Sequence, residues 1–366
     1  MRSHFKPHIE EMRRYQTSSN RDIENGYRLD RNERVANMDH GLMTEFLSSL
    51  PDHILNVTPD IAPLYNKLAE FHNIGKEQIY VTQGITECIN FLFATLCSPR
   101  ENVIVLDPTY PMYSIYAEMY QVEYRKFTYN KEHDADWDTL YDQIDNKTTM
   151  VMIANPNLPI ESSFTRKEIE KVLEHCSKRG IVVVIDEAYH YFGTDTVYDL
   201  TLKYDNLVVL RTFSKAWGLP AIRLGYAISH PDNINYLSKT RSLVETNAIS
   251  MEAALFALNR PSIIDDHVNE AKAGCSLLKT ELQKLGLEWH GGNFTNGLMI
   301  FLQNGTDSAE LVKFMREKKI YIRGAFEPPY DSCVRVSLGH PEQMQPFVDT
   351  LKEWLETKHH SERNTS

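Results

Sequence analysis

The sequence has few cysteines, no long apolar run and no excess of positive charge. Its five cysteines, Cys88, Cys97, Cys176, Cys275 and Cys333, are scattered and form no C-x-x-C pair. This spacing argues against a disulfide framework and against a zinc site, and we predict no metal. No apolar run could span a bilayer, and the N-terminal segment lacks the apolar core of a signal peptide. We therefore expect a cytoplasmic protein.

The net charge is −11, from 39 Lys and Arg against 50 Asp and Glu. An acidic surface argues against nucleic acid or an anionic membrane as the main partner. It still allows a small anionic ligand, because a local group of arginines can outweigh the global sign. The 366 residues, 42% of them hydrophobic, suit a globular chain with one large and one smaller domain.

The middle of the chain alternates strand and helix patterns. Apolar runs rich in β-branched residues predict buried strands at 103–106, 150–153, 181–185 and 207–210. Thr165 and Glu168 form a capping box that opens an amphipathic helix, and Gly180 stands where that helix would end. This strand–helix–strand order predicts an α/β fold, with a mostly parallel sheet and helices on both faces.

The last hundred residues predict a smaller α+β unit. Apolar residues from Val268 to Leu285 recur at helical spacing, and strand patterns follow at 298–302, 320–323 and 333–337. Further helices are expected near 308–318 and after residue 343. We predict an N-terminal arm (1–30), a large domain that holds a cofactor (31–250) and a small C-terminal domain (251–366).

The most specific segment is Thr212-Phe-Ser-Lys-Ala-Trp-Gly-Leu-Pro-Ala-Ile-Arg-Leu-Gly225, directly after a predicted strand. A lysine attacks an aldehyde only as the free amine, so burial or nearby positive charge must lower its pKa. The hydroxyls of Thr212 and Ser214, backbone N–H groups and Arg223 would make a phosphate cup around Lys215. The alternative is an exposed lysine near a loop, and the full pattern argues against it.

This segment resembles the cofactor-lysine signature of class II aminotransferases. From about Tyr15 to Gly339 the chain is similar to histidinol-phosphate aminotransferase and its relatives, although Ala221 stands where the family usually has glycine. The resemblance implies fold type I of the enzymes that use pyridoxal 5′-phosphate (PLP). It also implies that Lys215 holds the PLP cofactor as a Schiff base.

Further segments match the family's cofactor site. Asp186 follows a strand, where ligands of open α/β sheets bind, and the resemblance pairs it with the pyridine nitrogen. Tyr189 is expected to bond the ring 3′-oxygen, so the predicted catalytic residues are Lys215, Asp186 and Tyr189. Taken singly, each motif has an ordinary alternative, such as a turn residue or a helix cap. The predicted cofactor-binding residues are Gly84, Ile85, Thr86, Tyr110, Asn157, Asp186, Tyr189, Thr212, Ser214, Lys215 and Arg223.

Two arginines and one tyrosine are the predicted substrate residues. By resemblance, Arg335 holds the substrate α-carboxylate, while Arg323 and Tyr15 hold a distal anionic group such as a phosphate. A salt bridge at a strand edge is the alternative for each arginine. The expected partners are a small amino donor, a keto acceptor and a second copy of the chain in a homodimer.

The family pattern breaks at two places. Relatives carry Asn-Pro-Thr-Gly, whose Asn bonds the ring 3′-oxygen, where this chain has Leu158-Pro-Ile-Glu161. Leucine donates no hydrogen bond, so that oxygen would rely on Tyr189 or on Asn157. Relatives also have a tyrosine that reaches the phosphate from the neighbouring subunit, and here Thr58 stands in its place. Tyr65 is the candidate replacement.

We therefore predict a PLP-dependent aminotransferase. It would move an amino group, expected to come from L-glutamate, to a small keto or aldehyde acceptor that can carry a phosphate. One alternative is a PLP-dependent decarboxylase, or an elimination or cyclisation enzyme, acting on a phosphorylated or hydroxylated amino acid. Another is a non-catalytic PLP-binding protein. The joint presence of Lys215, Asp186, Tyr189, Arg223 and Arg335 argues against the last alternative.

Overall fold

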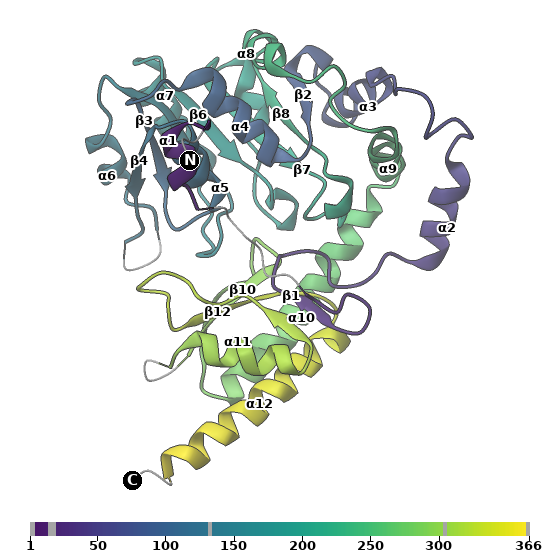
Figure 1. Ribbon diagram of the computed structural model, residues 1–366, viewed down its shortest axis with the longest axis vertical. Coiled ribbons are helices and arrows are strands. Elements are labelled where there is room, and N and C mark those ends of the chain that lie inside the picture. The colour runs from purple at the N-terminus through teal and green to yellow at the C-terminus, as the bar shows by residue number, and fades with distance from the viewer. Residues whose placement is uncertain (1–3, 14–19, 131–133, 303–305, 364–366) are drawn as a thin grey trace.

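The computed structural model describes residues 4–13, 20–130, 134–302 and 306–363 (Figure 1). Its centre is a seven-stranded sheet in the order β2-β8-β7-β6-β5-β3-β4. Strand β8 is antiparallel to both of its neighbours, and the other pairs are parallel. This confirms the mostly parallel α/β sheet. The strands are β2 (Ile79–Thr82), β3 (Asn102–Leu106), β4 (Glu123–Phe127), β5 (Thr148–Ala154), β6 (Val182–Asp186), β7 (Leu207–Thr212) and β8 (Gly225–Ser229).

Helices cover both faces of this sheet, as expected. Because side chains alternate along a strand, Val103 and Val105 of β3 pack into one apolar cluster and Ile104 and Leu106 into another. The first cluster includes residues of α4 (Ile85–Leu96), α5 (Met112–Met119) and α8 (Pro231–Leu237). The second includes residues of α6 (Trp137–Asp142) and α7 (Arg166–Ser177). Helix α7 begins with the predicted capping box.

A second, smaller sheet has the order β12-β10-β9 and is antiparallel. It consists of β9 (Glu288–Gly291), β10 (Gly297–Phe301) and β12 (Cys333–Ser337), accompanied by α11 (Ser308–Glu317) and α12 (Pro341–Arg363). Helix α10 (Ser262–Lys284) runs from the larger part of the molecule into the smaller one (Figure 1). Near the N-terminus, β1 (Tyr27–Leu29) pairs in parallel with β11 (Ile320–Ile322). The division at 30/31 and 250/251 stays a proposal, and the second boundary would lie inside α9 (Ala248–Leu258).

Strand β4 was not expected from the sequence. It is an edge strand of sequence EYRKF, largely polar and only partly buried, so it lacks the apolar run that marks its neighbours. The remaining helices are α1 (Pro7–Glu11), α2 (His40–Ser49), α3 (Ala62–His72), and the 3₁₀ turns η1 (Lys76–Gln78), η2 (His190–Phe192), η3 (Tyr198–Leu202), η4 (Pro220–Ile222) and η5 (Ser238–Thr240). In the parts of the chain that the structure describes, no helix combines the length and the apolar character needed to cross a membrane.

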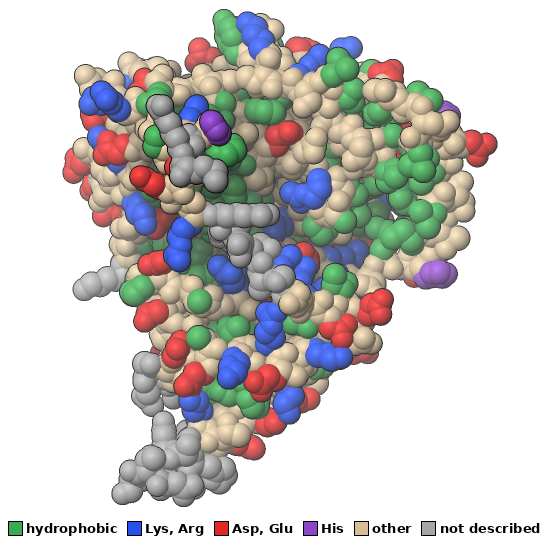
Figure 2. Space-filling view, in the orientation of Figure 1, with side chains coloured by type: hydrophobic (Ala, Val, Ile, Leu, Met, Phe, Trp, Pro, Cys, Tyr) green, Lys and Arg blue, Asp and Glu red, His purple; other side chains and the backbone are tan. Residues whose placement is uncertain are grey.

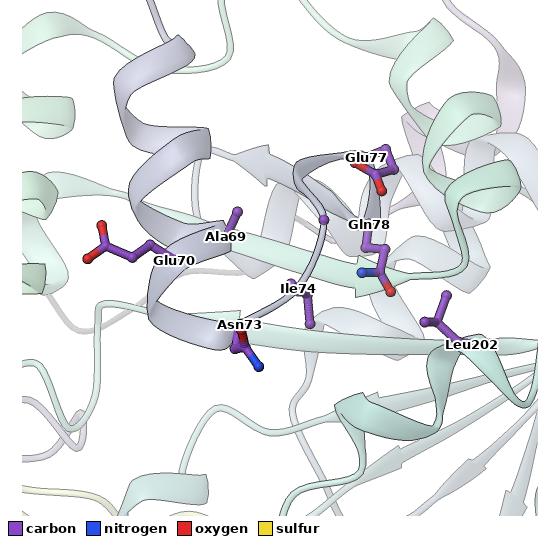
Figure 3. A pocket seen from close by; sticks show the side chains of 8 residues that line it. Ala69, Glu70, Asn73, Ile74, Glu77, Gln78 and Leu202 are labelled. Carbon is purple, nitrogen blue, oxygen red and sulfur yellow. The ribbon is translucent and has the colours of Figure 1, made fainter.

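A surface hollow of about 630 Å³ opens between the end of α3, η1 and η3 (Figure 3). Glu70, Asn73 and Glu77 are among its lining residues. It lies at the amino ends of β2 and β7. The chemistry-bearing segments follow the carboxyl ends of the strands, so they lie at the opposite edge of the sheet.

Candidate active site

The predicted cofactor residues meet at one edge of the seven-stranded sheet. Asp186 ends β6 and Thr212 ends β7, and three other predicted segments follow the carboxyl ends of β2, β3 and β5. Strand β8 runs in the opposite direction, so Arg223, just before it, lies at the same edge. Ligands of open α/β sheets bind at such an edge. Figure 2 shows Lys and Arg side chains along the junction between the larger and smaller parts.

Gly84 and Arg223 form a cradle at the start of α4. Gly84 caps the helix at φ +72°, and a Cβ added there would lie 2.9 Å from Nη2 of Arg223. A Cβ on Gly225 would lie 2.7 Å from the backbone nitrogen of Ile85, so only glycine allows this close approach. Helix N-termini attract anions, and an arginine beside one adds a full charge. Thr86 borders the cradle and shares a 3.0 Å hydrogen bond with the Tyr110 hydroxyl.

Lys215 lies in the turn after β7, behind Thr212 and Ser214. The Thr212 hydroxyl accepts a hydrogen bond from the Ser214 backbone nitrogen at 3.1 Å, which shapes this turn. The Lys215 ammonium donates to the carbonyl oxygens of Arg31 and Asn32 at 3.1 and 3.3 Å, and no carboxylate among the described residues forms an ion pair with it. It also lies 5.3 Å from the centre of the Tyr189 ring. The Lys215 side chain is half-buried, and its hydrogen bonds go to neutral backbone oxygens.

Asp186 is buried beneath the site, 4% exposed. Its carboxylate accepts hydrogen bonds from the Tyr113 hydroxyl at 2.6 Å and from the Ala188 backbone nitrogen at 3.0 Å. Burial raises the pKa of Asp186 to about 6, although the two hydrogen bonds and the charge of Lys215 act in the opposite direction. A buried carboxyl with a raised pKa is suited to share a proton with a ring nitrogen.

The side-chain amide of Asn157 is bonded to other protein groups and does not support the cofactor-binding role predicted for it. Its side-chain nitrogen donates to the Pro108 carbonyl at 2.8 Å and to the Tyr129 hydroxyl. Its side-chain oxygen accepts from the Thr109 hydroxyl at 2.6 Å. Both amide hydrogens are taken, so Asn157 has none left for a cofactor oxygen. This geometry argues against Asn157 as the replacement donor.

Arg323, just after β11, lies directly opposite Arg335 of β12 in the smaller part. Their backbones exchange hydrogen bonds of 3.0 and 2.6 Å. Residues directly opposite in an antiparallel pair project to the same face, so the two guanidinium groups share one side of the sheet. Arg335 also donates to the Asp30 carbonyl at 3.2 Å, one residue away from the Lys215 contacts. Tyr15, their predicted companion, lies outside the described residues.

Asn32 is a site residue that the sequence analysis missed. It is 1% exposed, and its side-chain nitrogen donates to the Tyr189 hydroxyl at 3.0 Å. It adopts φ +53°, a conformation in which asparagine is enriched. The only sequence signal was an asparagine three residues after the short YRL segment, and that signal does not reveal a long-range partner.

Tyr65 is engaged within its own subunit. Its hydroxyl donates to Glu245 at 3.0 Å and accepts from the Val81 backbone nitrogen at 3.2 Å. Thr58 lies on an exposed loop. The guess that Tyr65 replaces the tyrosine missing at Thr58 therefore has no support in this geometry.

These groups fit PLP. The cradle at Gly84, Ile85 and Arg223 suits a phosphate, the amine of Lys215 suits an aldehyde, and the buried carboxyl of Asp186 suits a protonated ring nitrogen.

Comparison with known proteins gives the same chemistry. The family description "Aminotransferase class I and II" matches residues 31–351. The chain is 29% identical to a histidinol-phosphate aminotransferase of Methanococcus aeolicus, over 89% of each chain. It is 30% identical to histidinol-phosphate aminotransferase 1 of Bacillus cereus, over 85% of this chain and 84% of that one.

Solved structures share the fold. The histidinol-phosphate aminotransferase from Sinorhizobium meliloti, in complex with pyridoxal-5′-phosphate, superposes with a TM-score of 0.86 at 19% identity, over 98% of this chain and 99% of that one. L-threonine-O-3-phosphate decarboxylase from Porphyromonas gingivalis gives a TM-score of 0.75 at 24% identity, over 90% and 99% of the two chains. Fold alone thus does not separate these two reactions.

Proposed function

This chain belongs to the aminotransferase class I and II family and is a PLP-dependent aminotransferase, and we propose that its amino acceptor is a small phosphorylated ketone or aldehyde. The proposed amino donor is L-glutamate. The observation that carries the proposal is the pair Arg323 and Arg335, which lie opposite each other, with Arg335 bonded to Asp30 next to the residues that Lys215 contacts. Such a pair suits the two anionic groups of the proposed reaction: the α-carboxylate of the glutamate donor at Arg335 and the phosphate of the acceptor at Arg323.

We assign the chain's own residues as follows. Gly84, Ile85 and Arg223 hold the cofactor phosphate, and Asp186 holds a proton on the ring nitrogen. Lys215 would hold the cofactor through its aldehyde carbon, and the Nζ of Lys215 would move the proton at the substrate Cα. When bound, PLP supplies a ring that accepts the electrons left behind at Cα.

The acceptor proposal is tested in the reverse direction, with L-histidinol phosphate and unphosphorylated L-histidinol as alternative amino donors to 2-oxoglutarate. Arg323→Ala is expected to lower kcat/KM for the phosphorylated compound about 10- to 100-fold, because it removes a charged hydrogen-bond donor. The value for the unphosphorylated compound should barely change. Arg166→Ala is the control, since Arg166 forms an exposed ion pair with Asp199.

Equal losses on both compounds would contradict a phosphate role for Arg323. Release of carbon dioxide from a phosphorylated amino acid, without transfer of its amino group, would favour the decarboxylase alternative. Leu158 is the residue that keeps this alternative open, because it stands where relatives have the asparagine.

We further propose a cytoplasmic homodimer that uses the surface of α2 and the loop after it. Met43, Leu47, Leu55 and Val57 are 38–80% exposed there, although all are apolar. Figure 2 shows hydrophobic side chains gathered on the side where Figure 1 draws α2 and α9. An exposed apolar patch of this kind favours association. Light scattering of the wild type and of Leu47→Arg should give a dimer and a monomer, respectively.

The five free thiols support the cytoplasmic location.

A further inference from the structure

Leu158 removes a hydrogen-bond donor from the site, and its neighbour does not replace it. The Leu158 side chain is 8% exposed and packs against the backbone of the smaller sheet, where a Cβ on Gly297 would lie 3.3 Å from its Cδ1. Asn157 has both amide hydrogens engaged elsewhere. A compensating donor must come from another part of the chain.

Asn32 reaches the same place from the N-terminal segment. A Cβ on Gly297 would lie 3.4 Å from Nδ2 of Asn32 and 3.6 Å from Cδ of Arg335, so Leu158, Asn32 and Arg335 surround one point. The Asn32 carbonyl accepts from Lys215, and its amide nitrogen donates to the Tyr189 hydroxyl at 3.0 Å. Asn32 therefore contacts two of the three predicted catalytic residues.

Ser337 determines which way the Asn32 amide points. The Ser337 hydroxyl accepts from the Asn32 backbone nitrogen at 2.8 Å, and it lies 3.3 Å from the Asn32 side-chain oxygen. The Ser337 hydroxyl hydrogen is donated to that side-chain oxygen while a lone pair accepts from the backbone nitrogen. The oxygen end of the amide thus faces Ser337, and the NH₂ end faces Tyr189.

We propose that Asn32 is a positioning residue that directs the Tyr189 hydroxyl hydrogen toward the cofactor's ring oxygen and so compensates for Leu158. A tyrosine hydroxyl has one hydrogen, and when it accepts from Asn32 that hydrogen is committed to another acceptor. Accepting a hydrogen bond also strengthens the hydroxyl as a donor. The inference rests on the proposed function and on the hydrogen bond from Tyr189 to the ring 3′-oxygen that the family resemblance implies.

The test is a spectroscopic pH titration of the PLP-loaded protein without substrate. Donors to the ring oxygen favour its anionic form and the unprotonated Lys215–cofactor nitrogen, so losing a donor raises the pH at which the visible absorption changes. Asn32→Gly removes the amide and still allows φ +53°. Asn32→Asp keeps the shape but cannot donate when ionised. Each variant is expected to raise the midpoint by about one pH unit.

Two further variants identify the route. In a Tyr189→Phe background, Asn32→Gly should shift the midpoint no further, because Asn32 acts through that hydroxyl. Adding Leu158→Asn to Asn32→Gly should lower the midpoint again, since it restores a donor at the family position. An unchanged midpoint in both Asn32 variants would overturn the inference. So would a shift of equal size in the Tyr189→Phe background.

Failure of the inference is distinguishable from failure of the proposed function. Borohydride reduction of the PLP-loaded wild type, followed by peptide mass spectrometry, should locate the cofactor on Lys215. If Lys215 is labelled but the titration midpoint does not change in the Asn32 variants, only the proposed role of Asn32 is overturned. Absence of labelling at Lys215 overturns the proposed function and the inference with it.

Discussion

The loops that follow β5 and β7 leave the same edge of the sheet but face different partners. The β7 loop, 213–224, carries Lys215 and places Arg223 beside Gly84 at the start of α4. The β5 loop, 155–161, instead contacts the smaller part of the molecule through its second half, 158–161. There Ile160 is fully buried against Met299 and Cys333.

Glu161 strengthens this difference. Its carboxylate accepts hydrogen bonds from the backbone nitrogens of Gly292 and Asn293 at 3.1 and 2.9 Å, and from the Thr295 hydroxyl at 2.7 Å. Apart from Ala221, the family pattern is kept in the loop that serves the cofactor, and it is lost in the loop that joins the two sheets. The departures at Leu158, Ile160 and Glu161 thus have a physical explanation in packing and hydrogen bonding between the two parts.

The largest expected effect lies in the β7 loop. Lys215→Ala should lower kcat by at least about 10³-fold, since it removes the group proposed to move the Cα proton. Thermal stability should change little, because the ammonium is half-buried and makes no ion pair with a described residue. Steady-state kinetics and thermal unfolding check both parts. A fall in melting temperature as large as that of a core variant would contradict the view that the β7 loop serves the chemistry and the β5 loop serves stability.

Asp186 ends β6, the strand between β5 and β7, and we expect it to lower stability while being needed for activity. Its folded pKa of about 6 exceeds the ordinary value of 3.8, so its stabilising contribution is present below pH 4 and is lost as pH rises through 6. In the cofactor-free protein, Asp186→Asn should therefore raise the free energy of unfolding at pH 8 by up to about 3 kcal/mol. Activity with PLP should fall about 100- to 1000-fold.

Denaturant unfolding at pH 4 and pH 8 checks the sign of this effect. Most of the gain should be lost at pH 4, where the native carboxyl is protonated and the unfolded one is only about half ionised. A gain that is the same at both pH values would show that the Asp186 charge is not its cause.

In the β5 loop, substitutions should affect stability more than activity. Glu161→Ala leaves two backbone N–H groups and a hydroxyl without their acceptor, and is expected to cost about 3 kcal/mol of unfolding free energy. Glu353→Gln is the matched control, because its ion pair with Lys318 is exposed and worth at most about 1 kcal/mol. A loss of kcat with unchanged stability would instead make Glu161 part of the chemistry and would break the comparison.

The same contrast explains how far the sequence could predict the structure. Buried strands such as 182–186 carry local apolar runs, and the lysine loop carries a local motif, so both could be predicted. The Asn32–Tyr189 hydrogen bond joins residues 157 positions apart, and no local pattern encodes it. The commitment of Asn157 to Pro108 and Tyr129 was hidden for the same reason. Long-range partners of single polar side chains come from tertiary packing alone.

The smallest expected effect concerns one methyl group in the β5 loop. Ile160→Val should cost about 0.5–1.5 kcal/mol of unfolding free energy, as expected for a fully buried isoleucine. Ile153→Val removes the same methyl group from the core of the seven-stranded sheet and serves as the control. If Ile160 only joins the two sheets, both variants should lose stability alike, and KM and kcat should stay within about two-fold of the wild type. A KM that changes in Ile160→Val but not in Ile153→Val would mean that Ile160 contacts substrate. The β5 loop would then serve the chemistry after all, through shape instead of hydrogen bonds.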